Sequence, residues 1–319
     1  MTVSAWTRIV PFICALTAAD LACAQNYPAR PIRLVTSAAG GASDFAARLI
    51  SQGLSTGLGQ QVIVDNRGGG VVPVEIVAKA PADGYTLLYY GSTLWLLPLL
   101  QEASYDALRD FMPVSLTVNS PVIVAVHPSV PAKSIKELIA LAKARPGALN
   151  YGSGGVGSPA HLASEMFKAL AGVDMVGVPF SGTGPALIAV VSGEIQVLMS
   201  ASGGMTPHMN AGRVRALAVS TAQRSASFPN LPTVAEAGVP GYEYGQYSGI
   251  FAPARTPAAV INRLNAEIVR VVHRADVKEK FFNTGTDSLG STPQEGVATI
   301  KSDVARFSKV IKGAKIRAQ

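Results

Sequence analysis

Three glycine-rich turns, each between a predicted strand and a predicted helix, carry the residues best suited to bind a ligand. They span residues 37–44 (SAAGGASD), 152–158 (GSGGVGS) and 180–185 (FSGTGP). Glycine lets backbone N–H groups approach a ligand, and the helix that follows presents unpaired N–H groups and the positive end of its dipole. Serine and threonine hydroxyls add further donors. Any one such turn is common in α/β proteins that bind nothing there, but three together predict a cradle for a small anion.

The candidate ligand-binding residues come from these turns, from the helix starts beside them and from the end of a further predicted strand at residues 86–90. Two candidates have a competing structural interpretation. Asp44 suits a helix cap, because its charge favours the positive end of the dipole, and His161 suits a packed or capping position. The full set is Ala39, Gly40, Gly41, Asp44, Ser92, Ser153, Gly155, Val156, Gly157, Ser158, His161, Phe180, Gly182, Thr183 and Gly184.

The second turn also fits the dinucleotide-binding spacing G-x-G-x-x-G, at Gly152, Gly154 and Gly157. That interpretation is disfavoured, because the acid that should end the next strand is missing and Asp174 precedes the strand instead. The histidines form no H-x-x-x-H pair, and no G-x-S-x-G motif occurs. The sequence therefore favours a binding protein without metal or cofactor. An exported hydrolase or isomerase of a small organic acid is the alternative.

The first 24 residues have the features of a cleavable secretory signal. Arg8 is followed by an apolar stretch over residues 9–19 and by the small-x-small triplet Ala22-Cys23-Ala24. The stretch is shorter than the roughly 20 residues that span a bilayer. A lipoprotein anchored at Cys23 is the alternative, disfavoured because Asp20 stands where such a signal needs an apolar side chain. Cleavage after residue 24 and release into the periplasm are predicted.

Composition narrows the class of ligand. Both cysteines, Cys14 and Cys23, lie inside the predicted signal, so the mature chain is expected to have no disulfide and no thiolate metal site. The chain holds 27 Lys and Arg against 20 Asp and Glu, a net charge of +7. A basic surface attracts anions. An exported protein is a poor candidate for binding nucleic acid, so small anionic solutes are the expected partners.

The elements that must position the turns alternate between strands and helices, an order that implies parallel sheets flanked by helices. The first set has strands predicted at residues 32–36, 62–64 and 86–90, with helices over 43–58 and 74–80. The second set has strands predicted at 122–126, 149–151, 175–178, 195–199 and 214–219, with helices over 134–145, 158–170 and 185–191.

The last third returns to helical patterns. One helix is predicted to begin at Thr256-Pro257, with the proline in its first turn, and another at a capping box formed by Thr292 and Glu295. These helices need a sheet to cover, so they are predicted to pack back onto the first set. Segments 121–126 and 244–252 then cross between two lobes and enclose a cleft, a preferred place for ligands. The predicted division is a signal at 1–24, lobe 1 from 25–124 with 247–319, and lobe 2 from 125–246.

Several short motifs occur in a specific order along essentially the whole mature chain. They are residues 27–33 (YPARPIR), 40–44 (GGASD), 59–67 (GQQVIVDNR), 83–88 (DGYTLL), 151–162 (YGSGGVGSPAHL) and 231–238 (LPTVAEAG). Together they resemble the Bug-type substrate-binding proteins of tripartite tricarboxylate transporters.

The resemblance implies a two-lobed periplasmic-binding-protein fold of the Venus-flytrap, type II-like kind. Each lobe is then a mostly parallel sheet flanked by helices, with two crossover strands. It implies capture of a small organic acid, often a di- or tricarboxylate, held largely by backbone amides and hydroxyls. It also implies a monomer that transiently contacts inner-membrane transporter subunits, with a sensor ectodomain as the alternative partner.

The sequence departs from the family pattern at three places near the expected site. An aromatic residue and a proline usually precede the glycines of the first turn, where residues 36–39 (TSAA) stand here. Glycines and valines at residues 68–72 replace a proline and further small residues. Ser181 replaces a usual lysine or arginine. The site is therefore expected to be roomier and less positive than is typical of the family.

Overall fold

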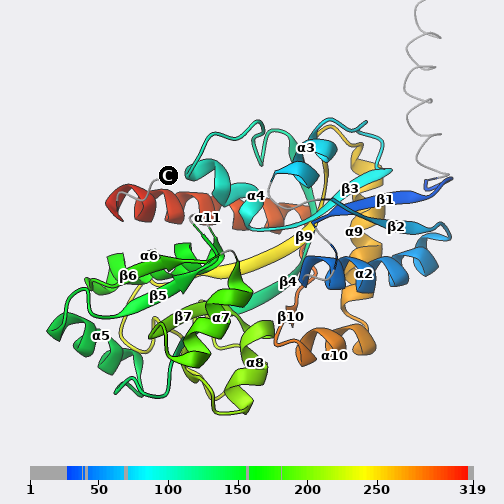
Figure 1. The fold of residues 1–319 in the computed structure, drawn as a ribbon. Helices are drawn as coiled ribbons and strands as arrows, with labels where there is room; N and C mark the ends of the chain where they lie inside the picture. Colours follow the sequence, from blue (N-terminus) through cyan, green and yellow to red (C-terminus); the bar gives the residue numbers. More distant parts are fainter. Residues whose placement is uncertain are drawn as a thin grey trace, which may run out of the picture.

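The structure, a computed structural model, describes residues 27–37, 39, 42–67, 71–155, 158–180 and 182–314. The predicted signal and four candidate site residues (Gly40, Gly41, Val156 and Gly157) lie outside the described residues. Two halves of the ribbon lie on either side of a pair of long strands (Figure 1). Within the described ranges, no helix is both long enough and apolar enough to cross a membrane.

The first half, which we call lobe 1, is built on a parallel sheet in which β1 lies between β2 and β3. Side chains alternate across it, so that Ile32 and Leu34 pack on one face and Val35 on the other. The β-α-β-α-β prediction is confirmed. The elements are β1 (Ile32–Thr36), α2 (Ala42–Leu58), β2 (Val62–Asn66), α3 (Val72–Ala78), β3 (Thr86–Gly91), α4 (Thr93–Leu96) and η2 (Leu97–Leu99).

The second half, lobe 2, repeats this architecture, with β5 between the parallel strands β6 and β7. Two of its helices, α5 and α6, begin where the sequence predicts, whereas α7 begins two residues earlier than predicted and α8 was not predicted. Ser134 and Ser158 accept hydrogen bonds from the backbone N–H of Glu137 and His161, at 3.2 and 3.3 Å, as helix caps do. The elements are α5 (Ile135–Ala144), β5 (Asn150–Ser153), α6 (Pro159–Ala171), β6 (Val176–Pro179), α7 (Thr183–Ser192), β7 (Val197–Ala201), α8 (Ser202–Asn210) and β8 (Arg215–Val219).

Two antiparallel strands, β4 (Phe111–Val126) and β9 (Gly245–Pro253), cross between the lobes. β9 pairs with β3 in lobe 1, and the far end of β4 pairs with β7 and β8 in lobe 2. The two predicted crossings are confirmed, but β4 begins well before the predicted strand at 122–126. The sequence analysis predicts no strand over the earlier part, which contains Pro113. Pro113 lies at a shift of the β4–β9 register, which lets the strand accommodate it.

The last third packs mostly onto lobe 1, but its final helix also contacts α6 of lobe 2. Its elements are α9 (Ala258–Val272), α10 (Ala275–Asn283), β10 (Asp287–Ser288) and α11 (Pro293–Ala314). Leu264 and Ile268 of α9 share one core cluster with Ile32 and Leu34 of β1. The Thr292–Glu295 capping box that precedes α11 is confirmed, with reciprocal bonds of 2.9 and 3.2 Å.

The predicted start of α9 is wrong by one residue. Thr256 is not its cap, because the hydroxyl of Thr256 donates to the carbonyl of Pro253 at 2.8 Å. Pro257 itself occupies the cap position and has an extended ψ of 138°. The threonine therefore closes the turn that leaves β9.

The segment from α10 to β10 joins the two lobes on one side. The hydroxyl of Ser202 in lobe 2 donates to the carbonyl of Gly285 at 2.5 Å. The hydroxyls of Ser225 and Ser227 donate to the carboxylate of Asp287 at 2.9 and 3.0 Å. These bonds tie lobe 2 to a segment that continues from the helices covering lobe 1.

Candidate functional site

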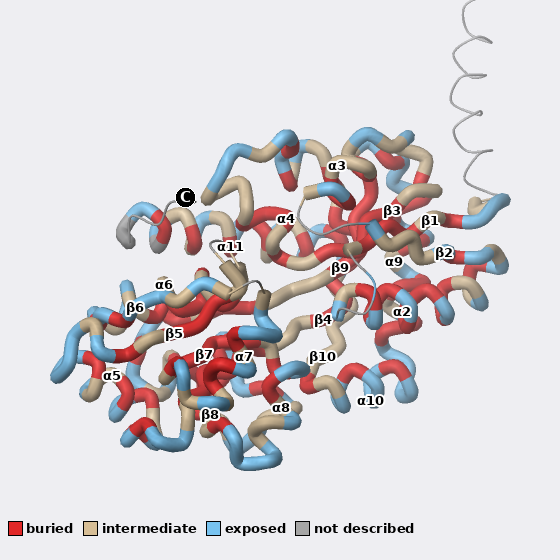
Figure 2. The backbone as a smooth tube through the Cα atoms, viewed as in Figure 1, coloured by how far each residue is buried: buried red, intermediate tan, exposed pale blue. Residues whose placement is uncertain are grey.

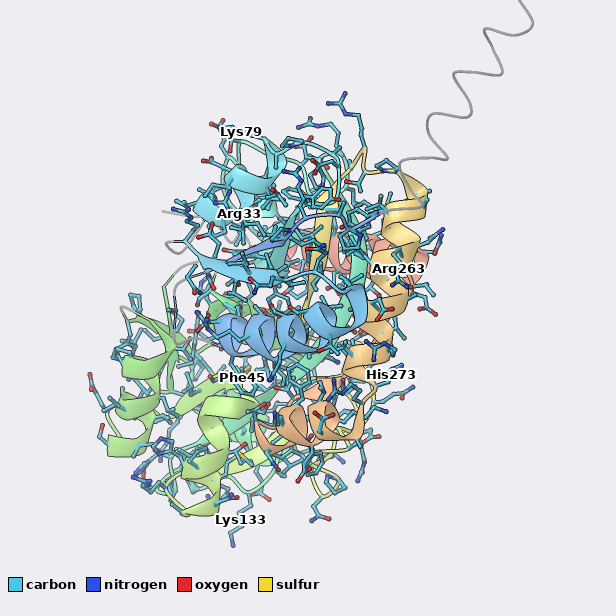
Figure 3. The ribbon with its side chains drawn as sticks, turned by 90° about the vertical axis from the view of Figure 1, so that its right-hand side faces the viewer. Arg33, Phe45, Lys79, Lys133, Arg263 and His273 are labelled. Carbon is cyan, nitrogen blue, oxygen red and sulfur yellow. The ribbon has the colours of Figure 1, made fainter. Side chains whose placement is uncertain are left out.

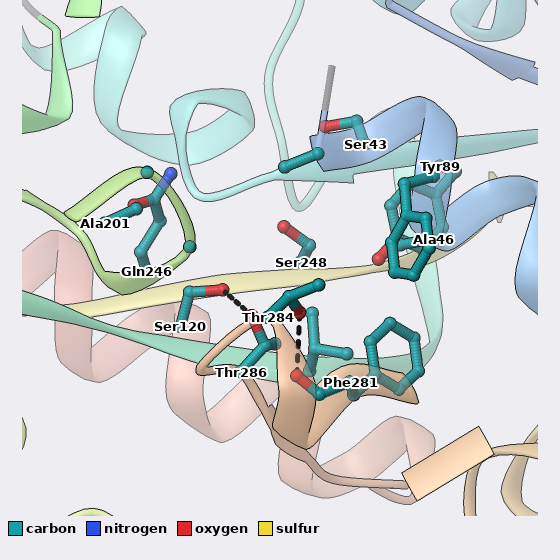
Figure 4. A pocket seen from close by; sticks show the side chains of 15 residues that line it. Ser43, Ala46, Tyr89, Ser120, Ala201, Gln246, Ser248, Phe281, Thr284 and Thr286 are labelled. Carbon is teal, nitrogen blue, oxygen red and sulfur yellow. Dashed lines mark hydrogen bonds between the residues drawn. The ribbon is translucent and has the colours of Figure 1, made fainter. Parts of the chain in front are cut away.

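A cavity of about 380 Å³ lies between the lobes. Its walls are the start of α2 from lobe 1, the β7–α8 junction from lobe 2 and the end of α10, while β4 and β9 cross its base (Figure 4). The volume is within the range typical of small-molecule sites. The cavity therefore lies where the sequence predicts an interlobe cleft.

The base of the cavity is the least buried part of the two crossing strands. Ser120 of β4 and Gln246 and Ser248 of β9 are half-buried, and Figure 2 shows these strands partly tan between the lobes. The hydroxyls of Ser120 and Thr286 are 3.2 Å apart and hydrogen-bonded. The side-chain Oε1 of Gln246 is buried and has no hydrogen-bond partner among the described residues. Neutral hydrogen-bonding groups thus face the cavity from below.

An aromatic wall forms the opposite side of the cavity. The rings of Phe45 in α2 and Phe281 in α10 meet edge to face, with centroids 6.3 Å apart and an interplanar angle of 86°. Phe281 is fully buried, whereas Phe45 keeps 41% of its surface exposed and projects from the side of α2 that faces lobe 2 (Figure 3). Tyr89 completes the wall, and burial raises the pKa of its hydroxyl, which therefore stays protonated.

The first glycine-rich turn reaches the cavity through Ala42 and Ser43, the first two residues of α2. Asp44 is nearly buried, and its carboxylate pairs with Arg48 at 2.8 Å and accepts a hydrogen bond from Asn66 at 2.9 Å. Asn66 also donates to the carbonyl of Ser37. Among the described contacts, the side chain of Asp44 therefore fixes the turn against β2.

The second and third glycine-rich turns lie against each other. The backbone N–H of Phe180 donates to the carbonyl of Ser153 at 2.9 Å. A Cβ atom added to Gly154 would lie 3.2 Å from the backbone nitrogen of Thr183, which explains why this position needs glycine. Gly155 has a φ of 100°, a conformation that L side chains rarely adopt. Two of the three predicted turns thus form one surface at the end of β5.

His161 and Ser92 occupy positions that support neighbouring backbone. The backbone N–H of His161 donates to the capping hydroxyl of Ser158. Burial lowers the pKa of the His161 side chain, and Lys168 lowers it further against the opposing effect of Glu165. The imidazole is therefore neutral at pH 7. Ser92 is buried, and its N–H donates to the carbonyl of Tyr247 at 2.9 Å, which places the end of β3 beside the crossing strand β9.

None of the described candidate residues is itself part of the cavity wall. The wall includes positions that sequence reasoning missed, among them Gly203 and Gly204 at the start of α8. Their signal was present, since residues 202–204 (SGG) form a fourth glycine-rich strand-to-helix junction. Pro207 inside α8 and the weak apolar periodicity of that helix obscured it. Phe45 was not among the candidate residues, and the structure places it at the cavity.

The site carries no net charge of its own. None of the described residues that line the cavity is ionised at pH 7. In the sequence of the three glycine-rich turns, Asp44 is the only charged residue. Such a surface can bind an anion through N–H and O–H donors and through helix dipoles, without a cation. Within the described residues, no cluster of acidic, histidine or cysteine side chains could hold a metal ion.

Comparison with solved structures defines the class of protein to which this fold belongs. The R. palustris protein Rpa4515, described as solved with adipate, superimposes with a TM-score of 0.80 at 35% identity, over 91% of this chain and 99% of that one. MatC from Rhodopseudomonas palustris, described with bound malate, gives a TM-score of 0.75 at 29% identity, over 89% and 100%. The fold is therefore that of a two-lobed periplasmic solute-binding receptor, and the predicted fold class is confirmed.

Sequence comparison shows the family to which the chain belongs. The family model described as "Tripartite tricarboxylate transporter family receptor" matches residues 46–316. The protein BugT of Bordetella pertussis is 34% identical over 302 residues, which cover 92% of this chain and 93% of the relative. The chain belongs to the tripartite tricarboxylate transporter receptor family, and the predicted Bug-type resemblance is confirmed. The members of this family are substrate-binding receptors, so the exported-enzyme alternative is dropped.

Proposed function

We propose that this protein captures a small organic di- or tricarboxylate, or a related acid, in the cleft between its lobes. The observation that carries the proposal is a neutral interlobe cavity bordered by the starts of α2 and α8. Helix starts attract carboxylates through unpaired N–H groups and the dipole. The adipate and malate of the two solved relatives are acids of this kind.

The proposed carboxylate cradle combines the three turns and Ser92. Backbone N–H groups of the first turn act from lobe 1, and those of the paired second and third turns act from lobe 2. The residues proposed for the cradle are Ala39, Gly40, Gly41, Asp44 through its backbone, Ser92, Ser153, Gly155, Val156, Gly157, Ser158, His161, Phe180, Gly182, Thr183 and Gly184.

Hydrogen bonds alone are strong enough for this task. Each bond to a charged group contributes about 1.5–3 kcal/mol net. Micromolar affinity needs about 8 kcal/mol. Four to six such bonds therefore suffice by order of magnitude, which is consistent with a site that lacks lysine and arginine.

Delivery of the ligand completes the proposed role. We take lobe 1 to comprise residues 25–124 with 247–319 and lobe 2 to comprise 125–246, so that ligand contacts from both lobes favour closure. The closed monomer would then present its ligand to membrane subunits of a tripartite transporter, or to a sensor ectodomain. Residues 1–24 would direct export and be removed in the periplasm.

Isothermal titration calorimetry of the mature chain with a panel of mono-, di- and tricarboxylates tests the function. We expect at least one acid to bind with one-to-one stoichiometry and a dissociation constant of about 1 μM or tighter. The same acid should raise the unfolding temperature, because it binds only the folded state. Amides of the same acids are the control and should not bind, since they lack the charge. The absence of any acid binder from the whole panel would contradict the proposal.

A further inference from the structure

The cavity has one apolar and one polar side, and this division restricts what the ligand can be. In Figure 4, Ala46, Tyr89 and Phe281 gather on one side, and Ser120, Gln246 and Thr286 on the other. The apolar side is contributed mainly by α2 and α10, whereas the polar side belongs to the crossing strands and the segment after α10. A ligand that fills the cavity must match both surfaces.

The apolar side contains a ring that is only half covered. Phe45 keeps 41% of its surface exposed although it borders a cavity and touches the buried Phe281. In a site of this size, the exposed face of an aromatic ring is stabilised most when an apolar or aromatic group of the ligand packs against it. The neighbouring wall residues Ala46 and Val118 offer no hydrogen bond from their side chains. This end of the cavity favours a hydrocarbon body over a charged group.

The polar side offers no cation to a second carboxylate. Its side chains are an amide and hydroxyls, and none of the described wall residues is a lysine or an arginine. One anionic group can be served by the helix starts. A second, placed against Phe45 and Phe281, would lose its hydration without gaining a partner. An uncharged hydroxyl or amide N–H on the ligand, by contrast, could donate a hydrogen bond to the buried Oε1 of Gln246, which has no described partner.

We propose that the preferred ligand is a monocarboxylic acid with an apolar or aromatic body that packs on Phe45 and Phe281. This inference rests on the proposed acid-binding function and, among the acids proposed there, favours a related monocarboxylic acid over the di- and tricarboxylates. It assigns to Phe45 the role of selecting such acids against di- and tricarboxylates of the same length.

Calorimetry with hexanoate and adipate, which share six carbons and differ in one terminal group, tests the selection. Phenylacetate represents the aromatic acids. We expect hexanoate or phenylacetate to bind at least about tenfold tighter than adipate, because burying an unpaired carboxylate is costly. Phe45→Ala should weaken binding of the apolar acid by about tenfold or more, because the ligand no longer buries its apolar body against the Phe45 ring.

The control variant is Phe282→Ala. Phe282 is the next residue in α10 after Phe281, it is 53% exposed, and it does not line the described cavity wall. This variant should bind like the wild type. Tighter binding of adipate than of hexanoate and phenylacetate, or equal affinity in the Phe45→Ala variant, overturns the inference but leaves the receptor function intact. Failure of every acid to bind overturns the proposed function itself.

Discussion

Replacing Ala42 with aspartate is expected to weaken ligand binding by about a hundredfold or more without unfolding the protein. Ala42 is the first residue of α2, and it is exposed at the wall of the cavity. A carboxylate there lies at the end of the helix that is proposed to hold the ligand's own carboxylate. Two like charges about 6 Å apart repel by about 3 kcal/mol at an effective dielectric constant of about 20, which corresponds to about a hundredfold.

The same substitution should not harm the fold. Aspartate in the first turn of a helix interacts favourably with the dipole, by about 0.3–1 kcal/mol. Ala42→Asn is the matched control, since it has nearly the same shape and no charge, and we expect its affinity to stay within about tenfold of wild type. Calorimetry and thermal unfolding of both variants provide the measurement. Equal affinities of the aspartate and asparagine variants would place the ligand's charge elsewhere.

Removing the carboxylate of Asp303 is expected to cost about 3–5 kcal/mol of unfolding free energy. Asp303 lies in α11 with only 1% of its surface exposed. It accepts a hydrogen bond from the indole N–H of Trp95 in lobe 1 at 3.2 Å and pairs with Arg306, which also pairs with Glu243 near the start of β9. Asp303→Ala leaves the indole and the guanidinium each short of an acceptor, so α11 loses its polar attachment to Trp95 and keeps only the Arg306–Glu243 pair.

The charge of Asp303 contributes less than its hydrogen bonds. Burial raises the pKa of this carboxyl, and the effect outweighs the opposing influence of Arg306 and Trp95. Asp303→Asn keeps an acceptor without the desolvated charge and should be less damaging than Asp303→Ala. Asp276→Ala is the control, because Asp276 pairs with Arg274 at 2.9 Å while 51% of its side chain is exposed, and such exposed pairs contribute little to stability. Urea unfolding measures all three variants, and equal losses for Asp303→Ala and Asp276→Ala would refute the argument.

Local sequence signals predicted most of the secondary structure because they act over a few residues. The capping serines and threonine at residues 134, 158 and 292 place helix starts correctly, since a cap depends only on its own turn. The early part of β4 could not be predicted in this way. It contains Pro113, which disfavours a strand, and it is held extended by pairing with β9 and β10, both more than a hundred residues away in sequence.

The sequence predicted a cleft between the lobes, but none of the described candidate residues lines the cavity found there. Glycine-rich turns are typical of backbone that approaches a ligand, but the close contact of Gly154 is with Thr183 of the neighbouring turn. The base and aromatic wall of the cavity come from Ser120, Gln246 and Phe45, whose types are common in any fold. Their convergence depends on how the two crossing strands bring the lobes together, which no local pattern encodes.

A crystal structure of the protein with its tightest-binding acid tests the central claim most directly. We predict the ligand between the lobes, with its carboxylate oxygens about 3 Å from backbone N–H groups at the start of α2 and at the paired turns of lobe 2. The rest of the ligand should lie over Phe45. A ligand bound outside this cleft, or held by one lobe alone, would contradict the account.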